Sequence, residues 1–123
     1  MATTKNQPFL KRLGFACGGL TAALRSENSF RFHVLAAVVV LAALVWLRPA
    51  PIWWGVMLLT VMAVLALELV NTAIEKLADH LHPETHPQIK LVKDCAAAAV
   101  LIASLCALGV AAALVVASVN GSP

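Results

Sequence analysis

Four polar residues at helical spacing are the part of this sequence best suited to chemistry. Glu68, Asn71, Glu75 and Asp79 follow a long apolar run. At about 100° per residue they fall at roughly 0°, 300°, 340° and 20° around a helix, so they share one narrow face, which we call the polar face. A carboxylate at bilayer depth costs on the order of 3 kcal/mol, and a polar helix–helix contact would not need one. We therefore expect this face to bind a cation, a proton or a polar substrate.

Two further groups of charged residues allow structural interpretations. Glu27 is the only acid before the first apolar run, and its simplest interpretation is a membrane-surface charge paired with Arg31. Lys93 and Asp94 precede the last apolar run, where they could form a structural ion pair, with Asp94 favouring the dipole at a helix start. Lys93 is also a cation placed where phosphates would arrive.

The histidines and cysteines give weaker signals. His80, His82 and His86 match the spacing of a zinc site only loosely, and no cysteine joins them, so we expect them to be solvated, with some able to touch a nucleotide. The sequence has no GxxxxGK[ST] phosphate loop, no GxGxxG and no HRD or DFG set, which excludes the soluble kinase designs. The cysteines show no paired spacing and are interpreted as small apolar side chains: Cys17, Cys95 and Cys106.

Composition places these residues in a membrane. Of 123 residues, 61% are apolar and 12% are charged, and the mean hydropathy is +0.87. These values predict a single membrane-embedded, all-α domain over residues 1–123. We expect spans at about 30–48, 52–72 and 95–119, with a break at Pro49 and Pro51 and with the second helix continuing to about Leu81. The first two runs hold only 16 strictly apolar residues each, so flanking residues must complete both spans.

The segment 8–26 has a different pattern. Its apolar residues recur close to every 3.6 positions, and Lys11, Arg12 and Arg25 lie off that face. This pattern predicts an amphipathic helix lying in the membrane interface. A fourth, partial span is the alternative.

The basic residues indicate the orientation. Five of them precede the first span: Lys5, Lys11, Arg12, Arg25 and Arg31. Three lie between the second and third spans: Lys76, Lys90 and Lys93. One, Arg48, lies in the first connection. The positive-inside rule then places the N-terminus and the second connection in the cytoplasm, where ATP and Mg²⁺ are available. Because these residues flank apolar runs rather than clustering with aromatics, the net charge of +3 indicates phospholipid contacts rather than nucleic acid.

Several stretches together match a known family, in its order and spacing, between Phe9 and about Leu114. They are Gly19-Leu20 with Ala23, Glu27, Phe30-Arg31, the block 68–75 with Asp79, and Lys93-Asp94 with residues 97–100. On these residues the chain resembles the small integral-membrane diacylglycerol kinases of bacteria, which include the undecaprenol kinases. His33 and His86-Pro87 are similar to the undecaprenol kinase branch.

The resemblance implies a bacterial inner-membrane protein with an N-terminal surface helix and three spans, assembled as a homotrimer with shared active sites. Glu68 resembles the catalytic base, and Glu27 and Glu75 resemble the carboxylates that hold Mg²⁺-ATP. Further ATP contacts are implied for Phe15, Glu84, Thr85, His86, Lys93 and Asp94, and lipid-substrate contacts for Phe30, Arg31, Glu68, Asn71 and Ala97. Pro8 stands where some members carry an arginine, a role that Lys11 or Arg12 would have to fill.

The sequence therefore predicts an ATP-dependent lipid kinase that phosphorylates the hydroxyl group of diacylglycerol, with undecaprenol as the alternative acceptor. A small oligomeric proton-coupled transporter, in which Glu68 and Glu75 relay protons, is a rival from another class. That interpretation leaves Glu27, Lys93 and Asp94 unexplained. A structural membrane subunit would leave the polar face without a purpose.

Overall fold

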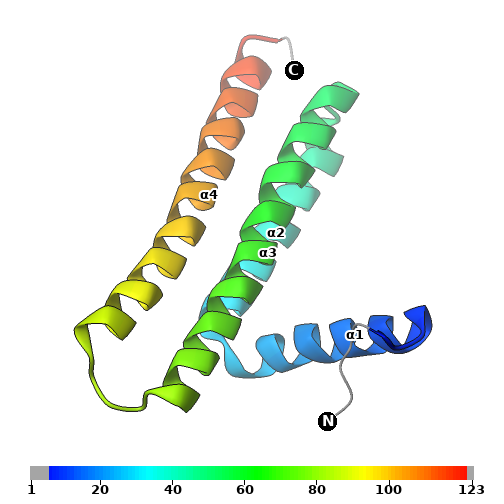
Figure 1. Ribbon diagram of the computed structural model, residues 1–123. Helices are drawn as coiled ribbons and strands as arrows, with labels where there is room; N and C mark the ends of the chain where they lie inside the picture. The colour runs from blue at the N-terminus through cyan, green and yellow to red at the C-terminus, as the bar shows by residue number, and fades with distance from the viewer. Residues whose placement is uncertain (1–5, 122–123) are drawn as a thin grey trace.

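Four helices make up the computed structural model, which describes residues 6–121. They are α1 (Phe9–Ser26), α2 (Asn28–Leu47), α3 (Pro51–Leu81) and α4 (Pro87–Val119). Figure 1 shows α2, α3 and α4 running side by side, with α1 turned away from them at one end. The predicted all-α fold is confirmed. Lys5, one of the basic residues used to predict the orientation, lies outside the described residues.

Local sequence explains where the helices begin and end. α2 stops before Arg48, which adopts a left-handed conformation with φ of 49°. α3 and α4 start with Pro51 and Pro87, at the position where a missing N–H removes no helical hydrogen bond. His86 caps α4, because its Nδ1 accepts a hydrogen bond of 3.2 Å from the backbone N–H of Gln88. The predicted break between the first two apolar runs is confirmed.

Three of the helices are long and apolar enough to cross a membrane: α2 with 20 residues, α3 with 31 and α4 with 33. At 1.5 Å per residue α2 is about 30 Å long, the thickness of a hydrocarbon core, so flanking residues do complete the first span. The chain is a multi-pass membrane protein. Because α4 begins at Pro87, Asp94 lies about two turns inside it. The expectation that Asp94 favours the dipole at a helix start is therefore wrong.

α3 is the central helix, with contacts to α1, α2 and α4. Its buried apolar residues Met57, Val61 and Val64 recur every three or four positions and form one packed stripe. Leu44 of α2 and Leu114 of α4 pack against this stripe. Most large apolar side chains on the outer faces remain exposed, as contact with lipid chains requires.

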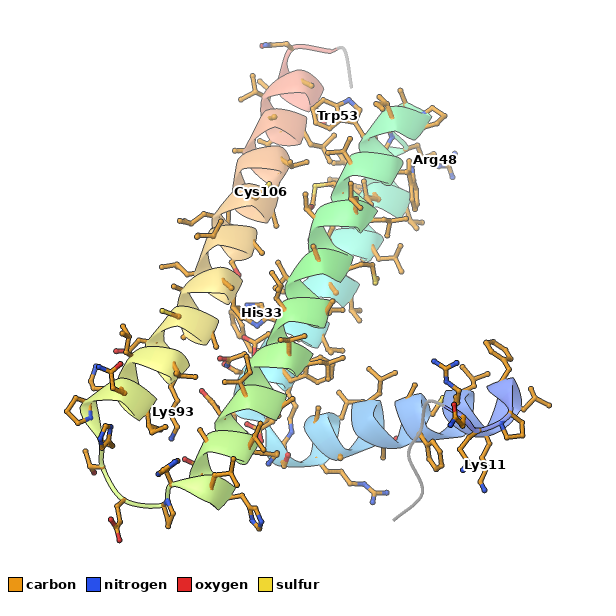
Figure 2. All side chains as sticks on the ribbon, viewed as in Figure 1. Lys11, His33, Arg48, Trp53, Lys93 and Cys106 are labelled. Carbon is orange, nitrogen blue, oxygen red and sulfur yellow. The ribbon has the colours of Figure 1, made fainter. Side chains whose placement is uncertain are left out.

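The two ends of the bundle differ. Figure 2 shows Lys11 and Lys93 at the end that carries α1 and the α3–α4 connection, and Arg48 and Trp53 at the opposite end. The polar face of α3 runs toward the first of these ends, since Asp79 lies close to the end of the helix at Leu81. Most of the charged residues considered above therefore lie at one end of the molecule.

Candidate active site

Glu68 occupies a position where the packing of α3 would normally place an apolar residue. It continues the stripe of Val61 and Val64 at the same spacing, and Thr72 follows one turn later. Glu68 is 4% exposed and Thr72 is 8% exposed. A buried carboxylate needs a partner that satisfies its oxygens. The structure therefore places Glu68 inside the helix bundle rather than toward lipid.

His33 of α2 provides that partner. Its Nδ1 lies 3.1 Å from Oε1 of Glu68 and 3.1 Å from the backbone carbonyl oxygen of Ser29, one turn earlier. Because a carbonyl oxygen can only accept, Nδ1 carries the hydrogen. In the sequence, only the family resemblance points to His33. Its position opposite Glu68 depends on how α2 and α3 pack, which spacing within one helix does not reveal.

Asn71 and Glu75 form the next part of the polar face. The Asn71 amide nitrogen donates to Oε1 of Glu75 at 3.4 Å. The other amide atom, Asn71 Oδ1, is buried without a hydrogen-bond partner in the described part of the chain. An unpartnered buried oxygen beside a carboxylate is suited to receive a cation or a hydrogen-bond donor from a ligand.

Glu27 stands at the joint between α1 and α2 and binds α3. Lys76 Nζ lies 3.1 Å from Glu27 Oε1, and the Ser26 hydroxyl donates to the same oxygen at 3.1 Å. The hydrogen bond from Lys76, followed by that from Ser26, lowers the pKa of Glu27. Glu27 is therefore ionised at neutral pH. Its partner Lys76 is the residue that follows Glu75 in the sequence.

Arg31 joins the end of α1 to the start of α2. Its guanidinium donates to the carbonyl oxygen of Leu24 at 2.6 Å, to the carbonyl oxygen of Arg25 and to Asn28 Oδ1 at 3.0 Å. It thus caps the end of α1 and fixes the turn into α2. The interpretation of Glu27 as the ion-pair partner of Arg31 is wrong, because Glu27 pairs with Lys76 instead.

A cavity of about 210 Å³ lies under the α3–α4 connection. Its lining brings together four of the predicted ATP-binding residues with the last acid of the polar face: Glu84, Thr85, His86, Lys93 and Asp79. Lys93 pairs with Asp79, whereas Asp94 pairs with Lys90 at 2.5 Å. The suggested ion pair between Lys93 and Asp94 is therefore wrong, and each residue holds a different neighbour.

The other predicted site residues lie apart from this cavity. Phe15 is 47% exposed on α1, and Ala97 is exposed on α4. Phe30 is only 2% exposed, so its ring is enclosed by the protein. Glu75 and Glu27 do not line the cavity either.

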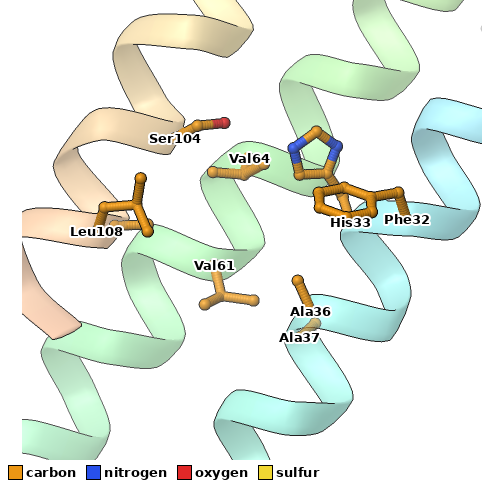
Figure 3. Close-up of a pocket in the computed structure, with 9 residues that line it drawn as sticks. Phe32, His33, Ala36, Ala37, Val61, Val64, Ser104 and Leu108 are labelled. Atoms are coloured by element: carbon orange, nitrogen blue, oxygen red, sulfur yellow. The ribbon is translucent and has the colours of Figure 1, made fainter.

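A second, largely apolar cavity of about 280 Å³ lies between α2, α3 and α4. Figure 3 shows His33 and Ser104 on opposite sides of it, with Val61 and Val64 between them. The Ser104 hydroxyl is buried and has no hydrogen-bond partner among the described residues. Sequence patterns do not predict this cavity, because three separate helices contribute to it.

The donor set fits a magnesium ion better than zinc. Within residues 6–121, no three His, Cys, Asp or Glu side chains converge as a ready-made metal site. Mg²⁺ typically takes one or two carboxylates and completes its shell with waters and substrate phosphates, so it needs no such cluster. Glu75 and the unpartnered Asn71 Oδ1 offer the oxygen atoms that this ion prefers.

Comparison with known proteins identifies the family of this chain. A model of the family "Prokaryotic diacylglycerol kinase" matches residues 14–115, and the chain belongs to this family. It is 36% identical over 94 residues to an undecaprenol kinase of Bacillus subtilis, covering 76% of each chain. It is 33% identical over 105 residues to a diacylglycerol kinase of Escherichia coli, covering 85% of this chain and 86% of the relative.

A third relative is a diacylglycerol kinase of Synechocystis, 36% identical over 94 residues. This match covers 76% of the present chain and 54% of the relative. The chain is accordingly a lipid kinase, and the family match does not favour the proton-coupled transporter.

Proposed function

We propose that this protein transfers the terminal phosphoryl group of ATP to the hydroxyl group of diacylglycerol at the cytoplasmic face of the bacterial inner membrane. The observation that carries the proposal is Glu68, which is 4% exposed within a membrane-spanning helix. A carboxylate there can take the proton of a hydroxyl group that remains within the bilayer. Membership of a lipid kinase family supports phosphoryl transfer as the reaction.

The cavity under the α3–α4 connection is the proposed binding site for ATP. Glu84, Thr85 and His86 supply polar groups, and Lys93 supplies positive charge. From Asp79 to Glu68 the polar face rises by about 16 Å, so the triphosphate would extend along α3 toward the base. Phe15 and Asp94 complete the proposed ATP contacts, Asp94 through its ion pair with Lys90.

Glu27 and Glu75 would hold Mg²⁺ together with phosphate oxygens. The ion supplies neutralisation of the negative charge that must move during phosphoryl transfer. Asn71 donates to Glu75 and thereby fixes the direction of this carboxylate. Lys76 holds Glu27 in its ionised form, as metal binding requires.

The proposed lipid contacts act in different ways. Asn71 lies on the polar face with Glu68, and Ala97 lies exposed on α4. Phe30 and Arg31 would act through the position of α1, because Phe30 is buried and Arg31 caps that helix. α1 would lie in the membrane interface as an amphipathic helix.

The family resemblance implies assembly of copies within the membrane, where the exposed apolar faces of the three spans can meet lipid or another copy. We propose a homotrimer in which the active site is shared between protomers. The N-terminus and the α3–α4 connection would lie in the cytoplasm, as the distribution of basic residues predicts.

The test is an assay of the purified protein in detergent with Mg²⁺-ATP, supplied in parallel with diacylglycerol and with undecaprenol. We expect phosphate transfer to diacylglycerol, with turnover collapsing in Glu68→Gln, which keeps the shape of the side chain but is a poor proton acceptor. Transfer to undecaprenol alone would show that undecaprenol, and not diacylglycerol, is the acceptor. Near-normal turnover of Glu68→Gln would remove Glu68 from the role of base.

A further inference from the structure

We infer that His33 is a positioning residue for phosphoryl transfer: it holds the Glu68 carboxylate at Oε1, so that Oε2 is left to meet the acceptor hydroxyl. This inference rests on the proposed role of Glu68 as the base. The contact joins α2 to α3, with 3.1 Å between His33 Nδ1 and Glu68 Oε1. Both side chains are shielded from water, with 20% of the His33 side chain and 5% of the Glu68 side chain exposed.

Glu68 depends on this contact for its orientation. Among the hydrogen bonds and ion pairs of residues 6–121, the pair with His33 is the one that involves Glu68. A buried carboxylate with a single donor takes the direction that the donor imposes. A base must lie within about 3 Å of the proton that it abstracts, so its direction bears directly on the rate.

The orientation of His33 is itself fixed by the backbone. Its Nδ1 is shared between Glu68 and the carbonyl oxygen of Ser29, at 3.1 Å in each case. The Phe32 ring packs edge-on at 5.5 Å between ring centroids. Because Nδ1 carries its hydrogen toward the Ser29 carbonyl oxygen, this nitrogen cannot accept a proton from the substrate, whereas Nε2 carries the lone pair of the ring. Recovery of activity in His33→Asn, which has no basic nitrogen, therefore distinguishes positioning of Glu68 from a second base at Nε2.

The pair also stands at a suitable place for a lipid hydroxyl. His33 borders the apolar cavity between α2, α3 and α4, as Figure 3 shows. Glu68 begins the polar face that leads to the ATP end of α3. The close contact between them thus joins the apolar and polar parts of the proposed site.

Two substitutions separate positioning from packing. His33→Leu fills similar space but donates no hydrogen bond, whereas His33→Asn places an amide N–H near the position of Nδ1. A hydrogen bond to a charged group corresponds to a factor of about ten to a hundred in rate. We expect His33→Leu to lower kcat by about that factor with little change in the KM for Mg²⁺-ATP, and His33→Asn to recover most of the loss. His80→Leu, at an exposed position of α3, is the matched control.

The combination with Glu68→Gln tests whether His33 acts through Glu68. If it does, His33→Leu should add almost no further loss to the residual rate of Glu68→Gln. Activity in the single variant Glu68→Gln would overturn the proposed base. If Glu68→Gln is inactive but the single variant His33→Leu keeps a normal kcat, only the role of His33 is overturned. A loss in His33→Asn as large as in His33→Leu would also overturn it.

A spectroscopic measurement covers the case in which His33→Leu does not fold. Nuclear magnetic resonance of protein labelled with ¹⁵N in its histidines should show one imidazole with a retained Nδ1 proton. Its Nδ1 signal should shift in Glu68→Gln and remain unchanged in His80→Leu. An Nδ1 signal that does not respond to Glu68→Gln would contradict the contact.

Discussion

Lys76 of α3 binds Glu27 at the joint between α1 and α2, with 3.1 Å between Nζ and Oε1. The contact ties α1 to the central helix at the position next to Glu75. A lysine beside a proposed magnesium ligand competes for the same carboxylate oxygen when Mg²⁺ binds. The pair therefore links the placement of α1 to the proposed metal site.

The Lys76–Glu27 contact should leave a signature in the dependence of stability on pH. Lys76 lowers the pKa of Glu27 below its ordinary value of 4.5. A lowered pKa in the folded state means that the contact stabilises above pH 4.5 and that this contribution is lost as pH falls through the folded pKa. Since 60% of the Lys76 side chain is exposed, we expect less than about 1 kcal/mol.

The measurement is thermal unfolding in detergent of the wild type and of Lys76→Met. The Tm of the wild type should be slightly higher than that of Lys76→Met near neutral pH, and this difference should vanish in acid below the pKa of Glu27. If the difference stays constant down to about pH 3, the stabilisation comes from the aliphatic stem of Lys76 and not from its charge.

Glu27 and Glu75 should behave as one unit toward magnesium. Glu27→Ala and Glu75→Ala should each weaken the apparent affinity for Mg²⁺-ATP, and the double variant should lose less than the sum of the two free-energy changes, because both carboxylates serve one ion. The KM for Mg²⁺-ATP and the dependence of rate on free Mg²⁺ provide the measurement. Fully additive losses with an unchanged Mg²⁺ dependence would make both residues structural.

Lys93 should matter more than its neighbour Lys90. Both line the cavity under the α3–α4 connection, but Lys93 is half-shielded, with 34% of its side chain exposed against 73% for Lys90. We expect Lys93→Met to reduce kcat/KM for ATP by at least about tenfold, as for loss of a shielded charge that faces phosphate, and Lys90→Met to have a much smaller effect. Equal effects of the two substitutions would show that the cavity gathers positive charge without a specific contact.

The helices could be predicted from sequence because their limits depend on local signals. Pro51 and Pro87 mark helix starts, and Arg48 precedes a proline that ends α2. The sharing of one face by Glu68 and Glu75 follows from spacing within α3 alone. These features need no knowledge of how helices pack.

The contacts between helices could not be predicted in the same way. His33 meets Glu68, and Lys76 meets Glu27, only because α2, α3 and the end of α1 adopt a particular rotation and register. Several packing geometries are compatible with one apolar stripe, so periodicity does not choose among them. Lys93 was singled out as a cation for phosphates, but its pairing with Asp79 likewise required the structure.

Topology is the last prediction, and the proposed ATP site depends on it. The α3–α4 connection and α1 lie at one end of the bundle, and the α2–α3 connection lies at the other (Figure 1). The basic residues predict that the first end is cytoplasmic. Thr85 should therefore be protected from outside reagents, while Ala50 and Asn120, which are exposed, should be accessible from the periplasm.

Single cysteines at these three positions can be probed in intact cells after the three native cysteines, all exposed, have been replaced. A thiol reagent that does not cross the inner membrane should label Ala50→Cys and Asn120→Cys and should label Thr85→Cys only after the cells are lysed. Retained kinase activity in each variant is the control for native structure. Labelling of Thr85→Cys alone in intact cells would place the cavity with Lys93 in the periplasm, where ATP is not available, and would refute the proposed nucleotide site.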